Sequence, residues 1–148
     1  MIVPFKDVVA QASEMAKQNL SNYGYLEKVV ITITDQGPRI NALHWSDEEQ
    51  KRKTIANFIA LTSPLNCHFY VMVGEARMRE IPFDGSVEQV DCILVTAETR
   101  LGERIVVITP IKREGNSIQF GKTTWKDDQE QLQKYAQFNL LQGIFGNR

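Results

Sequence analysis

Four β-rich segments follow one another in the second half of the chain, and their short connections constrain the fold more than any other feature. The segments cover residues 67–79, 88–99, 104–112 and 117–124. Leu101-Gly102 and Gly115-Asn116 lie in the tight connections between the later segments, and both pairs are typical of turns. Because strands joined by so few residues must pair antiparallel, the sequence predicts a four-stranded meander.

Helix and strand patterns also flank the meander. Apolar residues recur at helical spacing near the N-terminus, and a run rich in β-branched residues follows them. We expect a first helix, an N-terminal strand and a last helix, over residues 4–19, 26–34 and 127–142 respectively.

A second helix has the clearest start signal. Ser46 followed by Glu49 fits a capping box, in which each side chain satisfies a free backbone N–H of the first turn. Ser63-Pro64 then ends the helix. This helix leaves open whether the N-terminal strand runs parallel or antiparallel to the meander.

The elements together predict the α+β class. We expect one domain over residues 1–148, with a mainly antiparallel sheet formed by the four-stranded meander plus the N-terminal strand, flanked by about three helices. Strands such as CHFYVMV and RIVVITPI have long apolar stretches, which indicates that both sheet faces are at least partly covered.

Composition argues against two classes of partner. The 17 basic and 18 acidic side chains are spread evenly, so no segment concentrates the Lys and Arg that nucleic-acid binding needs. No apolar run of membrane-spanning length occurs. Charges at Lys6, Asp7 and Glu14 interrupt the N-terminus, which is unlike a secretory signal. We therefore expect a cytoplasmic protein in which Cys67 and Cys92 are reduced.

No motif specifies a metal, a cofactor or a reaction. Cys67 and His68 are adjacent, so on a strand they point to opposite faces, and neither C-x-x-C nor H-E-x-x-H occurs. The glycines match no nucleotide-binding loop. Only His44 and His68 could serve as imidazole bases for a nucleophile. We expect no metal and no cofactor.

Two acids interrupt apolar strand sequence, Glu75 and Glu98. If the first hairpin of the meander is centred on its connection, Glu75 lies opposite Cys92, and Glu98 is then roughly 20 Å away. A two-carboxylate glycosidase needs roughly 5 to 10 Å. The two acids are therefore not expected to act as a catalytic pair.

The rim of the sheet is a candidate ligand-binding site. Glu75, Arg77 and Arg79 alternate along one strand and so share a face. They could mark a strand end emerging into water, or the arginines could hold an anionic group in a polar pocket. With Glu98, these are the candidate ligand-binding residues.

The C-terminal region is apolar nearly all round, at Phe138, Leu141, Ile144 and Phe145. These side chains are either buried between the sheet and the first helix, or they form a surface for self-association or a protein partner.

The sequence favours a non-catalytic interaction or assembly protein, either a homodimer or bound to a protein partner. The missing catalytic motifs and the apolar C-terminus motivate this prediction. The alternative is a small enzyme or an anionic-ligand-binding module with its site near the sheet rim.

Overall fold

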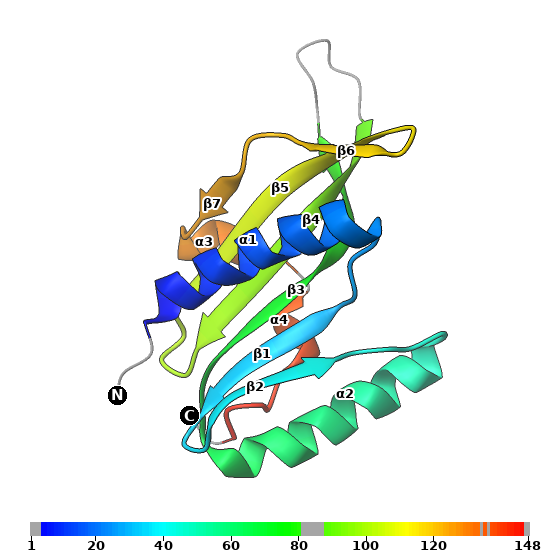
Figure 1. The fold of residues 1–148 in the computed structure, drawn as a ribbon. Coiled ribbons are helices and arrows are strands. Elements are labelled where there is room, and N and C mark those ends of the chain that lie inside the picture. Colours follow the sequence, from blue (N-terminus) through cyan, green and yellow to red (C-terminus); the bar gives the residue numbers. More distant parts are fainter. Residues whose placement is uncertain (1–3, 81–87, 134, 136, 147–148) are drawn as a thin grey trace.

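The computed structural model describes residues 4–80, 88–133, 135 and 137–146. Within these residues, helices cover both faces of an antiparallel sheet, which confirms the α+β class (Figure 1). In chain order the elements are α1 Phe5–Tyr23, β1 Val29–Thr34, β2 Gly37–Ala42, α2 Glu48–Thr62, the 3-10 turn η1 Ser63–Leu65, β3 Cys67–Glu80, β4 Glu88–Thr99, β5 Arg104–Glu114, β6 Ser117–Phe120, β7 Thr124–Lys126, α3 Gln129–Leu132 and α4 Gln137–Leu140.

The strands pair as the short connections require. Among the described strands the order is β2-β1-β3-β4-β5-β6, with β7 also beside β5, and every pairing is antiparallel. This order confirms the meander. It also gives the direction that the sequence left open, because β1 runs antiparallel to β3.

The last segment of the meander differs from the prediction. The predicted strand over residues 117–124 is replaced by two shorter strands over residues 117–120 and 124–126: β6 pairs with the end of β5, and β7 pairs with its first half. Pro110 lies on β5 between these two regions and has no backbone N–H to donate. The N–H of Gly121 still donates to the Pro110 carbonyl at 2.9 Å, so the chain bends there without leaving β5.

The first helix is one turn longer than predicted. It buries Val9, Ala12, Ala16 and Leu20 against β3 and β4, and ends at Gly24. Gly24 has a left-handed φ of 79°, and its N–H donates to the carbonyl of Leu20 at 2.9 Å. This arrangement is a common helix ending.

The capping box of the second helix was placed one residue too early. Asp47 is the N-cap, and its side chain accepts the N–H of Gln50 at 2.8 Å. Ser46 instead donates both its N–H and its hydroxyl to the Gln50 side chain. Gln50 is thus bonded through both its backbone N–H and its side chain, a reciprocal arrangement like that of a capping box.

The predicted helix over 127–142 is wrong as a continuous element. Its chain forms α3 and α4, and the cap is Asp128 instead of Asp127. Leu132, Tyr135, Phe138, Leu141 and Ile144 are all buried at intervals of three residues. Hydrogen bonds of the three-residue type connect Tyr135 to Leu132, Phe138 to Tyr135, and Ile144 to Leu141. An α-helix would rotate such a set by about 60° at each step, whereas turns of three residues keep it on one face.

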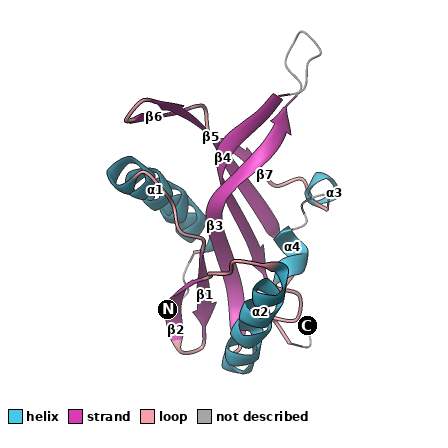
Figure 2. Ribbon diagram, turned by 90° about the vertical axis from the view of Figure 1, so that its right-hand side faces the viewer, coloured by secondary structure: helices cyan, strands magenta, loops and turns pink. Residues whose placement is uncertain are grey.

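Helices lie on both sides of the sheet (Figure 2), and an apolar layer is buried on each of its faces. α1 covers one layer, which contains Phe69, Val71 and Val95. α2, α4 and the C-terminal chain cover the other, which contains Tyr70 and Met72. The long apolar strand segments are thus explained, because neither face is left entirely to solvent.

Candidate functional site

A groove of about 630 Å³ lies at the rim of the sheet, lined by residues of β3, β4, β5 and β6 together with Gly121. Its charged lining consists of Arg77, Asp91, Lys112 and Arg113. The volume falls in the range of small-molecule sites. The sequence candidate Arg77 therefore lies in a cavity.

Strand alternation places Glu75 and Arg77 on one face at this end of the sheet. They continue the face on which Phe69, Val71 and Val73 are buried beneath α1. Glu75 lies opposite Ile93, and Arg77 opposite Asp91.

The predicted neighbour Cys92 is wrong by one residue. It faces Ala76, and both belong to the apolar layer on the other face. A slip of one residue in register exchanges the two faces, which is why sequence reasoning missed Asp91.

Four charged side chains form a network across three strands. Asp91 accepts from the Nε of Arg77 at 3.1 Å and lies 3.6 Å from the Nη1 of Arg113. The Nη2 of Arg113 donates to Glu75, whose other carboxylate oxygen accepts the backbone N–H of Leu26. The hydrogen bond to Glu75 raises the pKa of Arg113, which stays a cation. Both carboxylates thus hold Arg113 in place.

The groove also has an apolar side. Ile111 is buried, and Phe120 and Pro110 line the groove with it. A β-carbon added to Gly121 would lie only 3.1 Å from the Cβ of Pro110, so the two residues are in close contact. The site therefore combines an apolar wall with a charged rim.

Glu98 is not part of this groove. It lies opposite Tyr70 on β3, five residues beyond the partner of Glu75, and so projects from the other face. There it is only 4% exposed and pairs with Arg104. The sequence grouped Glu98 with the rim residues, whereas the structure separates them. Arg79 is on β3, but its side chain lies outside the described residues.

The candidate interaction residues Phe138, Leu141, Ile144 and Phe145 are all buried within this chain. The ring of Phe145 packs 5.9 Å from that of Tyr70. They pack against the sheet face opposite α1, so the alternative that placed them between the sheet and the first helix is wrong. In this conformation they offer no exposed surface to a partner.

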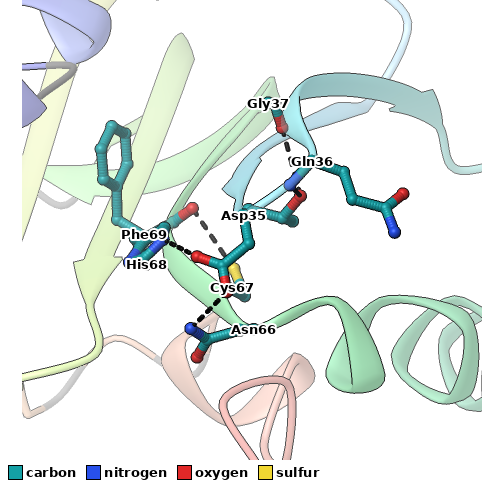
Figure 3. A network of polar contacts seen from close by, with 8 residues as sticks. Asp35, Gln36, Gly37, Asn66, Cys67, His68 and Phe69 are labelled. Atoms are coloured by element: carbon teal, nitrogen blue, oxygen red, sulfur yellow. Dashed lines mark hydrogen bonds and ion pairs between the residues drawn. The ribbon is translucent and has the colours of Figure 1, made fainter. Parts of the chain in front are cut away.

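A polar network joins the β1–β2 turn to the start of β3 (Figure 3). Asp35 accepts from the Nδ2 of Asn66 at 2.8 Å and lies 2.7 Å from the Nε2 of His68. Cys67, between them in sequence, is buried, and burial raises the pKa of its thiol to about 12. A thiol of this kind stays protonated at neutral pH and is a poor nucleophile. His44 lies elsewhere, beside Glu27.

In the described part of the chain, no three His, Cys, Asp or Glu side chains are grouped as metal ligands. None of its helices combines the length and apolarity required to cross a membrane. No family model matches the chain, and no curated protein or solved structure matches it significantly.

Proposed function

We propose that the groove at the sheet rim binds a small amphipathic anion, and that the protein is a binding module and not an enzyme. The observation that carries this proposal is the convergence of Arg77 and Arg113 on Asp91 at the groove. Among the described charged residues that line it, three are cationic and one is anionic, and Glu75 beside them pairs with Arg113.

Arg77 is the cation best placed to hold the ligand. Its side chain is 67% exposed and donates to Asp91 through Nε. A guanidinium has five N–H donors, so its two Nη groups can take the oxygens of an anionic group in a bidentate pair. Arg113 is held by Glu75 and Asp91, which supports a role in positioning Asp91 and in maintaining positive charge.

The apolar wall selects the rest of the ligand. Ile111, Phe120 and Pro110 offer contacts that gain free energy by excluding water from an apolar group. A ligand with a short aromatic or alkyl body and one anionic group matches both sides of the groove.

Calorimetric titration with 4-phenylbutyrate tests the proposal, and 4-phenylbutyramide is its uncharged match. We expect the carboxylate to bind, the amide to bind more weakly, and Arg77→Gln to weaken carboxylate binding by about tenfold. Arg52→Gln, at an exposed position on α2, is the matched control. Equal binding of acid and amide, or unchanged binding by Arg77→Gln, would contradict the proposal.

Self-association as a homodimer is a second candidate function, supported by the exposed edge strand β2. Ile40 on this strand is 65% exposed, and β2 pairs only with β1 among the described strands. Unpaired strand edges are common places for strand addition. Light scattering at high protein concentration should give a dimer for the wild type and a monomer for Ile40→Lys. A monomeric wild type would count against this candidate.

A cytoplasmic location is also a proposal. It is supported by Cys67 and Cys92, which are both buried and form no disulfide. Thiol titration in denaturant, on protein isolated without reductant, should find both thiols free. A disulfide between them would contradict a reducing compartment.

A further inference from the structure

A second cavity, of about 450 Å³, lies on the opposite face of the sheet beneath the C-terminal chain. Glu98 and Arg104 line it from the β4–β5 hairpin, and Phe138, Asn139, Gln142 and Gly143 line it from above. The groove at the rim shares none of these residues. Any binding here is therefore separate from the proposed function.

The floor of this cavity is an ion pair between the buried Glu98 and the partly exposed Arg104. Glu98 and Arg104 are directly opposite in register, and the Nε of Arg104 donates to the carboxylate at 2.9 Å. The hydroxyl of Tyr70, which is fully buried, donates to the other oxygen at 3.3 Å. Burying charges removes their hydration, and well-packed apolar residues of similar volume often stabilise a fold as well or better. Stability alone therefore does not explain the pair, and its remaining polar atoms are candidates for binding a ligand.

Those remaining atoms belong to the guanidinium of Arg104. Its Cζ lies 4.7 Å from the ring centroid of Phe138, a cation–π contact that helps to hold the guanidinium in place. Nε is used by Glu98, and among the described residues no hydrogen bond from either Nη group is seen. Arg104 therefore presents a pre-oriented pair of donors at a cavity.

A second guanidinium lies beside the cavity. Arg100 donates through Nη1 to the carbonyl of Phe145, a lining residue, at 2.7 Å. Among the described lining residues Glu98 and Arg104 are the charged ones and form a pair, and the charge of Arg100 also acts on Asp35. The two Nη groups of Arg104 are donors only, and they match the two oxygens of a carboxylate.

We propose that this cavity is a binding site for a small polar carboxylate, held by the Nη groups of Arg104, with Glu98 and Tyr70 fixing that guanidinium from behind. The amides of Asn139 and Gln142, both on the exposed side of the cavity, offer further hydrogen bonds to polar substituents of the ligand.

NMR titration with sodium propionate at constant ionic strength tests this site, and propionamide is the uncharged match. The readouts are the Nε–Hε signal of Arg104 and the backbone amide of Gly143. We expect both to shift saturably with propionate and not with propionamide, and we expect Arg77→Gln, in the rim groove, to leave these two shifts unchanged. Arg104→Lys keeps the charge but loses the planar fork, and should weaken binding by about tenfold.

A second variant keeps the test decisive if Arg104→Lys does not fold. Asn139→Trp places a large side chain at the exposed mouth of the cavity and should abolish the saturable shift at Gly143. Asn22→Trp, on the exposed end of α1, is its matched control and should leave the shift intact. Shifts that do not saturate, that propionamide reproduces, or that persist in Asn139→Trp would each overturn the proposal.

Discussion

The two faces of the sheet are covered in different ways. On one face α1, a regular helix of 19 residues, lies across β3 and β4 and presents an unbroken apolar stripe. On the other face, α2 buries only Phe58 and Thr62 among its described side chains, and the C-terminal chain completes the cover with turns of three residues.

The difference explains where polar side chains lie. A regular helix packs closely along its length, so the polar network of Glu75, Arg77 and Arg113 lies beyond the helix-covered core, at the rim. An irregular chain leaves a gap beneath it, and Glu98 with Arg104 occupies that gap. Regular cover thus excludes a site from the middle of a face, whereas irregular cover allows one there.

The largest expected effects test whether the irregular cover is as much a part of the core as α1. Leu20→Ala and Ile144→Ala each remove a fully buried side chain, one from each face. Each should lower the free energy of unfolding by about 3 kcal/mol, because the removed apolar contacts leave a cavity. Urea unfolding measures both. Leu101→Ala, at an exposed turn, should change it by less than about 0.5 kcal/mol. An equally small effect of Ile144→Ala would break the comparison, since the C-terminal chain would then be only loosely attached.

A slightly smaller effect is expected from the ion pair beneath the irregular cover. Arg104→Met leaves Glu98 buried without its cation, and should destabilise the protein by about 2 to 3 kcal/mol at neutral pH. Arg77→Met breaks a pair on the exposed rim, and should cost less than about 1 kcal/mol. The double variant Glu98→Leu/Arg104→Met should recover most of the stability lost. Equal losses from Arg104→Met and Arg77→Met would show that the cavity floor is as well solvated as the rim.

The regular face was the easier one to predict from the sequence. The stripe of α1, the meander and its turns follow from local periodicity and from connection length, both of which are written in consecutive residues. Near the C-terminus, buried residues recur every three positions. On an α-helix of 3.6 residues per turn this spacing would distribute apolar side chains around the whole circumference. The three-residue turns are stabilised by packing against the sheet, and the strands of that sheet come from other parts of the sequence.

The candidate site was predictable only in part. Alternation on one strand correctly placed Glu75 and Arg77 on one face. Asp91 interrupts the apolar run VDCILV and was a visible signal, but a shift of one residue in strand register moves it to the other face of the sheet. Arg113 and Arg104 are contributed by β5, and their roles depend on pairing between strands, which a single sequence does not specify.

A smaller effect concerns the bend that shapes the rim groove. Gly121→Ala would place a β-carbon 3.1 Å from the Cβ and 3.2 Å from the Cγ of Pro110, whose ring cannot rotate away. We expect a loss of about 1 to 2 kcal/mol and weaker binding of 4-phenylbutyrate, with propionate binding on the other face unchanged. Gly115→Asn is the control, because Asn tolerates its left-handed φ of 59° and no atom lies near. Loss of binding at both sites would show that the two faces are coupled.

The smallest effect is expected at the end of the sheet, outside both apolar layers. Hydrogen bonds from Asn66 and His68 lower the pKa of Asp35 below its ordinary value of 3.8. A carboxyl whose pKa is lower in the folded state adds stability above the unfolded pKa, and this contribution disappears as the pH falls through the folded pKa. Asp35→Asn should therefore lower stability at pH 7 slightly and have no such effect well below pH 4.

Asn66→Gly removes the side-chain hydrogen bond to Asp35 while keeping the backbone conformation. Asn66 has a left-handed φ of 57°, which Gly adopts without strain, so only the side-chain amide is lost. NMR titration of the Asp35 carboxyl should then give a pKa closer to 3.8 than in the wild type, because one of the two donors is gone. An ordinary Asp35 pKa already in the wild type would mean that solvent screens this network completely. The contrast between the faces would then lie in apolar packing and in the buried pair of Glu98 and Arg104 alone.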